Sequence, residues 1–212
     1  MSASFAIDTQ LAESIEARFG VPKHMLTHDG GIVLRSRTDL DALAARGITI
    51  HNGRVSVDYT GIAAQSLGTL LPLAQHLIAQ AGPGAELRAK VATVVGLAQV
   101  TRYEIPEDAA DGTGKLSFRT PLALLARGAG DCDSKVCLAA AMLKSVGLAS
   151  VAIIVGRSHA LLGVEIPTRS GDAAIALNGR CYVVTEATTP VPIGFCGPDE
   201  VTHGTAFSGI VI

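Results

Sequence analysis

The feature that most constrains the fold is an apolar stretch in the second half of the chain. From Val136 to Leu143 the sequence carries no charged residue, so a helix formed there has no face suited to water. Such a helix must be covered over most of its circumference by other elements. We therefore predict a buried helix that packs on a sheet, with Ala139, Ala140 and Leu143 among its packed residues.

The surrounding pattern predicts helices first and strands afterwards. Helical patterns cover residues 8–19, 63–80, 84–100, 120–126 and 132–146, and Pro72 is expected to kink or split the second of them. Strand-like runs then follow at 150–155, 159–166, 175–177 and 182–185, with an Asn-Gly turn before the last. This order is typical of an α+β domain, here with an antiparallel sheet.

Composition limits the class of protein. The chain has 212 residues, of which 48% are hydrophobic and 17% charged, as is typical of a globular domain. A net charge of −2 demands no basic surface, so neither nucleic acid nor an anionic membrane is expected as a partner. The sequence has no secretory signal at its start and no clean apolar span of about 20 residues, so we expect a cytoplasmic protein.

The four cysteines, Cys132, Cys137, Cys181 and Cys196, all lie in the second half of the chain. Without an export signal a disulfide framework is not expected, which leaves free thiols, catalysis or metal binding. A zinc site could combine Cys132 and Cys137 with the other cysteines or His159, but the spacing has no C-x2-C pair. The glycine-rich pieces match no nucleotide-binding fingerprint. We therefore predict no metal and no cofactor.

Cys132 stands where a thiol is most easily activated. It follows Gly128-Ala-Gly-Asp131 and opens the apolar helix. The first turn of a helix lowers the pKa of a thiol through its unpaired N–H groups and the positive end of the helix dipole. The glycines let the chain turn sharply, and the backbone N–H of Cys132 is left free to donate to an oxyanion. The alternative is a buried structural thiol.

A nucleophilic thiol needs a proton partner, and two later residues suit that role. His159 begins one strand-like run and Glu186 ends another. In an antiparallel sheet the start of one strand can lie beside the end of its neighbour, so the two side chains could meet facing the helix start. This is the arrangement of nucleophile, base and orienting residue in a thiol triad. Glu165, on the same run as His159, is the rival of Glu186.

The other polar candidates have simpler interpretations. Asp131 and Asp133 are expected to cap the helix, and Lys135 could pair with one of them. Gln99 is a candidate side-chain donor to the oxyanion, by analogy with thiol proteases that carry a Gln upstream of the cysteine. A polar residue at a helix end is the alternative for Gln99.

Three segments together resemble the core of the transglutaminase-like superfamily: GAGDCDSKVCLAAAMLKSVGL, SHALLGVEIP and YVVTEATTPVPIG. In that superfamily a GDCD-type motif holds the nucleophile, a strand that starts with His holds the base, and a strand that ends in Asp or Glu holds the third member. The resemblance covers about residues 85 to 195 and includes LAQVTRYEIP before the loop. It implies a papain-like fold with Cys132, His159 and Glu186 as the triad. Glu in the third place resembles a bacterial and archaeal branch.

The resemblance implies acyl transfer at an amide or peptide bond, with a peptide or protein as substrate. Transfer to water would make the chain a cysteine peptidase or amidase, which we favour because no amine site is apparent. Transfer to an amine would make it a transglutaminase, with a deamidase as the related option, and a non-catalytic peptide-binding module is the third alternative. We expect residues 61–212 to form the catalytic domain and residues 1–60 a helix-plus-hairpin element. The hairpin is expected to join residues 48–51 and 54–59 through an Asn52-Gly53 turn.

Overall fold

The structure is a computed structural model that describes residues 6–29, 31–51, 53–107, 112–156, 159–196 and 208–212. Its helices are α1 (Thr9–Arg18), the 3₁₀ helix η1 (Lys23–Met25), α2 (Arg37–Ala44), α3 (Tyr59–Gln80), α4 (Leu87–Val100), α5 (Pro121–Arg127) and α6 (Cys132–Ser145). Its strands are β1 (Ile48–His51), β2 (Arg54–Val57), β3 (Arg102–Tyr103), β4 (Ala129–Gly130), β5 (Val151–Val155), β6 (Ala160–Val164), β7 (Ala174–Leu177), β8 (Arg180–Thr185) and β9 (Ser208–Val211).

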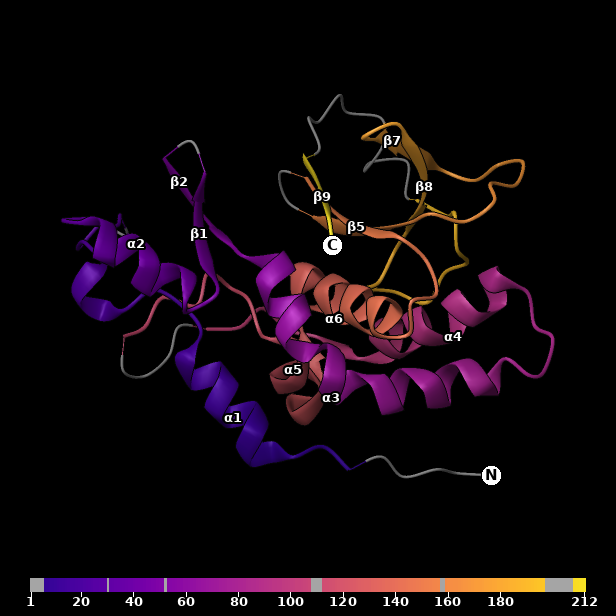
Figure 1. Cartoon of the computed structure of the whole chain (residues 1–212), viewed down its shortest axis with the longest axis horizontal. Coiled ribbons are helices and arrows are strands. Elements are labelled where there is room, and N and C mark those ends of the chain that lie inside the picture. The colour runs from indigo at the N-terminus through magenta and orange to yellow at the C-terminus, as the bar shows by residue number, and fades with distance from the viewer. Residues whose placement is uncertain (1–5, 30, 52, 108–111, 157–158, 197–207) are drawn as a thin grey trace.

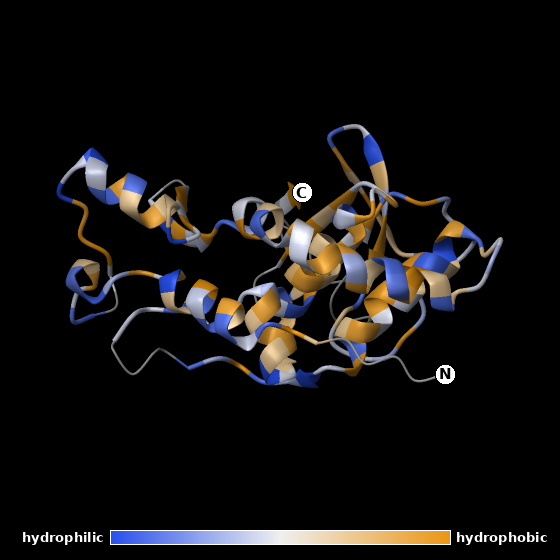
Figure 2. Cartoon of the chain, turned by 60° about the horizontal axis from the view of Figure 1, so that its bottom comes forward, coloured by the Kyte–Doolittle hydropathy of each residue, from blue (hydrophilic) through white to orange (hydrophobic). Residues whose placement is uncertain are grey.

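Helix α6 forms the centre of the molecule, as its lack of charge predicts. It packs against β5 and β6 on one side and against α3, α4 and α5 on the other (Figure 1). Ala139, Ala140 and Leu143 are 0% exposed, which confirms the predicted packing of this helix. Figure 2 shows the same arrangement in hydropathy, with hydrophobic residues concentrated on the central helices and strands.

The large sheet has five strands in the order β7-β8-β6-β5-β9, and each neighbouring pair is antiparallel. Together with the helices this gives the mixed α+β architecture that the sequence predicts. Asn178 and Gly179 have φ of 51° and 76°, so the predicted Asn-Gly turn joins β7 to β8. The register pairs Leu162 with Thr185, which brings the start of β6 beside the end of β8.

Helix α3 differs from the prediction in one respect, because it runs without a break from Tyr59 to Gln80 with Pro72 inside it. Of the two expected outcomes, a kink or a split, the split is therefore excluded. Leu70, Leu73 and Ala74, which flank the proline, are all buried, and this packing offsets the hydrogen bond that proline removes.

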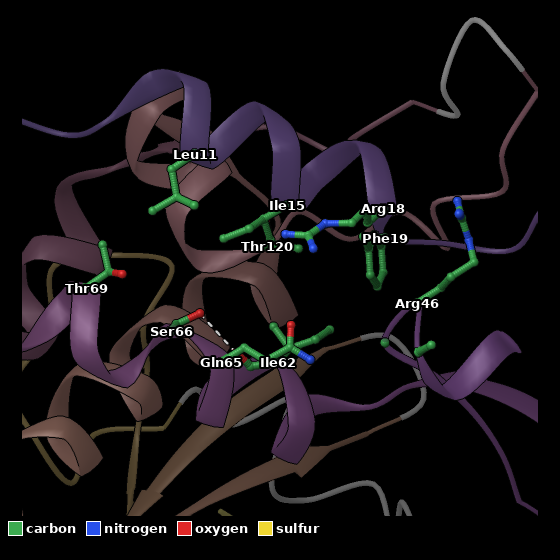
Figure 3. A pocket seen from close by; sticks show the side chains of 12 residues that line it. Leu11, Ile15, Arg18, Phe19, Arg46, Ile62, Gln65, Ser66, Thr69 and Thr120 are labelled. Carbon is green, nitrogen blue, oxygen red and sulfur yellow. Dashed lines mark hydrogen bonds between the residues drawn. The ribbon is translucent and has the colours of Figure 1, made fainter. Parts of the chain in front are cut away.

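The N-terminal residues contribute to the same core as the rest of the chain. Helix α1 and the β1–β2 hairpin form as predicted, although Asn52 of the hairpin turn is outside the described residues. One cluster of buried hydrophobic residues extends from Ala12 to Ile212. Figure 3 shows α1 above α3, with a cavity of about 470 Å³ between them. None of the described helices combines the length and hydropathy needed to cross a bilayer.

Candidate active site

The turn into α6 depends on two glycines, Gly128 for its backbone conformation and Gly130 for lack of space. Helix α5 ends at Gly128, which has a φ of 69°, in the left-handed region that favours glycine. A Cβ on Gly130 would lie 2.7 Å from Cδ1 of Leu124, so a side chain there would collide with α5. The chain then enters α6 at Cys132, which is half-buried in the first turn. Within the described residues, no acceptor pairs with the Cys132 N–H.

Asp131 and Asp133 cap the start of α6, as expected. The Ser134 N–H donates to Oδ1 of Asp131 at 3.3 Å and to Oδ1 of Asp133 at 3.0 Å. The Tyr59 hydroxyl donates to Oδ2 of Asp133 at 2.7 Å. Burial, followed by the hydrogen bond with Asp131, raises the pKa of Asp133 to about 8. Burial thus disfavours a negative charge on Asp133 beside the thiol.

We expect Asp133→Asn to flatten the dependence of stability on pH. A carboxyl whose pKa rises on folding stabilises the protein fully below its ordinary pKa of 3.8, and this contribution is lost as the pH rises through about 8. Across that window the wild type should lose up to about 1.4 kcal/mol per pH unit relative to the variant. Urea unfolding of both proteins at a series of pH values measures the difference. Parallel curves would show that Asp133 titrates normally.

His159 and Glu186 meet where β6 begins and β8 ends. Nε2 of His159 donates to Oε2 of Glu186 at 2.7 Å. The nearby Cys132 thiol, followed by the bond to Glu186, raises the pKa of His159 to about 10. The His159 side chain is 23% exposed and that of Glu186 is 6% exposed. The imidazole can therefore meet a substrate from solvent while its carboxylate partner stays covered.

Glu186 is fixed as a carboxylate by its neighbours. Its Oε1 accepts hydrogen bonds from the backbone N–H and the hydroxyl of Thr188, both at 2.6 Å. Burial tends to raise the pKa of Glu186, but the hydrogen bonds from His159 and Thr188 hold it below its ordinary value. The rival Glu165 pairs instead with Arg180 at 2.9 Å, so Glu186 is the residue that contacts His159.

Gln99 and Lys135 have hydrogen-bond partners that the sequence did not predict. The Gln99 amide donates to the carbonyls of Glu186 at 3.0 Å and Val191 at 2.9 Å. Both of its hydrogens are engaged, so the predicted oxyanion role of Gln99 is not supported. Lys135 does not pair with Asp131 or Asp133. Its Nζ is buried and donates to the carbonyls of Thr101 at 2.7 Å and Thr188 at 3.0 Å.

Sequence reasoning missed Tyr103, which lies near Cys132. Strand β3 pairs in parallel with β4, with Tyr103 opposite Gly130. The Tyr103 hydroxyl is near the Cys132 thiol, and burial, followed by the charge of Cys132, raises the pKa of Tyr103. The pairing joins two strands of two residues each that are far apart in the sequence, so no local sequence pattern predicts it. The one available signal was the LAQVTRYEIP segment of the family resemblance.

Two cavities lie away from these residues. One of about 470 Å³ is lined by α1, α3 and neighbouring turns, and another of about 580 Å³ by α1, α5 and the segments around Pro106 and Lys115. Neither is lined by Cys132, His159 or Glu186. In the part of the chain that is described, no three His, Cys, Asp or Glu side chains are grouped as a metal ion requires.

The chain has been compared with known proteins. No family model and no curated protein matches it. Among solved structures it is similar to Legionella pneumophila LapG, with a TM-score of 0.37 and 17% identity over 61% of this chain and 76% of that chain. An EGTA-treated LapG structure gives the same TM-score and identity, over 61% and 74% of the two chains. These similarities are too distant to assign a family, and the function proposed below follows from the residues of the site.

Proposed function

We propose that this chain is a thiol-dependent acyl-transfer enzyme with a transglutaminase-like, papain-type core, and that it hydrolyses amide or peptide bonds. Cys132 is the nucleophile, His159 the base and Glu186 the residue that orients the base. The observation that most supports this is the His159 ring, which bonds to the Glu186 carboxylate at 2.7 Å and also contacts the Cys132 thiol. The order thiol, imidazole, carboxylate is the one a nucleophilic triad requires.

The chemistry follows from this order. An imidazolium beside a cysteine favours the thiolate, which attacks the substrate carbonyl carbon and forms a C–S bond. His159 then passes its proton to the leaving nitrogen as the C–N bond breaks. Water, deprotonated by His159, attacks the thioester and releases the acid and the free thiol. Because Nε2 is bonded to Glu186, these transfers would use Nδ1 of the ring.

The Cys132 N–H is the first donor to the oxyanion that forms during each attack. It stands at the start of α6, where backbone N–H groups have no partner within the helix. A donor that is already oriented and unpaired stabilises the developing charge without reorganisation. We further propose a reducing, cytoplasmic setting for this chemistry, because a nucleophilic thiol must stay reduced to act. Residues 1–60 are proposed to support the catalytic domain of residues 61–212.

The test is turnover of unfolded casein in heavy-oxygen water that also contains a fluorescent primary amine, with the Cys132→Ala protein as the blank. Hydrolysis would place heavy oxygen in newly formed carboxyl termini, which is the expected result. Attachment of the amine to glutamine side chains would instead identify a transglutaminase. Equal signals from the wild type and the blank on casein, and on a mixture of short peptide amides, would favour a binding module.

A further inference from the structure

Tyr103 is held rigidly next to the nucleophile. The backbone on both sides of it pairs with the turn into α6: the Arg102 N–H donates to the Gly128 carbonyl at 3.2 Å, and the Glu104 N–H to the Gly130 carbonyl at 3.1 Å. Arg119 reinforces this pairing, since it donates to the Ala129 carbonyl at 2.6 Å and reaches Glu104 at 3.3 Å. The position of Tyr103 relative to Cys132 is therefore fixed by the fold.

The Tyr103 side chain is open to solvent and lies near the thiol. Its pairing opposite Gly130 sets it two residues from Cys132 along β4 and α6, the Cys132 charge acts on its hydroxyl, and the residue is 51% exposed. By contrast, the other tyrosines, Tyr59 and Tyr182, are buried. An exposed aromatic residue beside the thiol is accessible to a substrate that arrives from solvent.

Geometry relates this position to the oxyanion. In the tetrahedral intermediate the carbonyl carbon is bonded to Sγ, so the oxyanion is two bonds from the sulfur. A donor that lies beside the thiol can therefore reach that oxygen by a rotation of its side chain. Gln99, the residue expected to do this from the sequence, has both amide hydrogens engaged elsewhere.

We propose that the Tyr103 hydroxyl is the second donor to the oxyanion, alongside the Cys132 N–H. This inference rests on the proposed function and adds a catalytic residue to it. The hydroxyl donates a hydrogen bond to the oxyanion and transfers no proton to it. The oxygen needs no proton, because its negative charge disappears when the leaving group departs and the C=O bond forms again. The raised pKa of Tyr103 keeps the hydroxyl protonated, and thus a donor, throughout the neutral range.

Two reagents that attack the same sulfur separate an oxyanion donor from a residue that merely positions the thiol. p-Nitrophenyl acetate acylates a thiolate through a tetrahedral oxyanion and releases p-nitrophenolate. Iodoacetamide alkylates it by direct displacement at carbon, without an oxyanion. Both rates are measured at Cys132, with the background of the Cys132→Ala protein subtracted.

We expect Tyr103→Phe to slow acylation by about 10²-fold and to leave alkylation within about twofold of wild type, because only acylation builds the oxyanion. Tyr182→Phe is the matched control. It also removes one hydroxyl, which is hydrogen-bonded to Ser150 at 3.1 Å, and it should change neither rate. Unchanged acylation in Tyr103→Phe would overturn the proposal, as would an equal fall in both rates. A wild-type Cys132 inert to both reagents would overturn the proposed function itself, and this inference with it.

Discussion

Replacing Cys132 with alanine is expected to abolish acyl transfer and leave the fold intact. Removing the nucleophile of a catalytic triad lowers turnover by about 10⁴-fold or more. Cys132 is only half-buried in the first turn of α6, so losing its sulfur opens little cavity. The thermal midpoint of the variant should therefore stay close to that of the wild type. Turnover of casein or acylation by p-nitrophenyl acetate, together with a thermal melt, measures both effects.

Cys137 is the matched control, since it lies on the same helix. It is 0% exposed, and burial raises the pKa of its thiol far above the ordinary value, so it has no means to act as a nucleophile. Cys137→Ala should lower the free energy of unfolding, because truncation in a packed core leaves a cavity, and should preserve activity. If Cys137→Ala alone abolished activity without unfolding the protein, the nucleophile would be misassigned.

The largest loss of stability near the site is expected from Lys135→Met. Lys135 is 0% exposed, and its ammonium joins the end of α4 to the segment after β8 through the carbonyls of Thr101 and Thr188. Methionine fills similar space but leaves both carbonyls without this donor, at a cost of about 3 kcal/mol. Because Thr188 also holds the Glu186 carboxylate, the variant should react more slowly at Cys132 even where it is fully folded.

Lys115→Met is the control that separates the two expected effects of Lys135→Met, which are lower stability and a slower reaction at Cys132. Lys115 is similarly buried, and its Nζ donates to the carbonyls of Glu16 at 2.5 Å and Phe19 at 2.7 Å, away from the triad. Urea unfolding should show a comparable destabilisation for both variants, whereas acylation of the folded protein should fall only in Lys135→Met. Equal acylation rates in both folded variants would mean that Lys135 does not position Glu186.

The sequence predicted the elements that depend on local pattern and on burial. The uncharged run from Val136 to Leu143 identified the central helix, and the Asn178-Gly179 turn located the hairpin that leads to Glu186. The meeting of His159 with Glu186 followed from the antiparallel order alone. Each of these predictions rests on a few consecutive residues or on the antiparallel order of the strands.

The features that escaped prediction depend on contacts between distant segments. Strand β9 consists of only four residues and forms by pairing with β5, and β3 forms by pairing with β4. The roles of Gln99 and Lys135 were predicted from the polar character of their side chains. Their partners are backbone carbonyls, which no sequence pattern identifies. Tyr103 acquires its place beside Cys132 only through the β3–β4 pairing.

The central claim, that Cys132 is an activated nucleophile, is tested most directly by competition among the four thiols of the native protein. A limiting amount of iodoacetamide at about pH 6 is followed by proteolysis and mass spectrometry of each cysteine. Cys181 is the internal control, because it is exposed and the structure gives it no imidazole partner among the described residues. We predict that Cys132 is labelled well before Cys181 and that His159→Ala removes this preference. Labelling of Cys181 first, or a preference for Cys132 that persists without His159, would contradict the account.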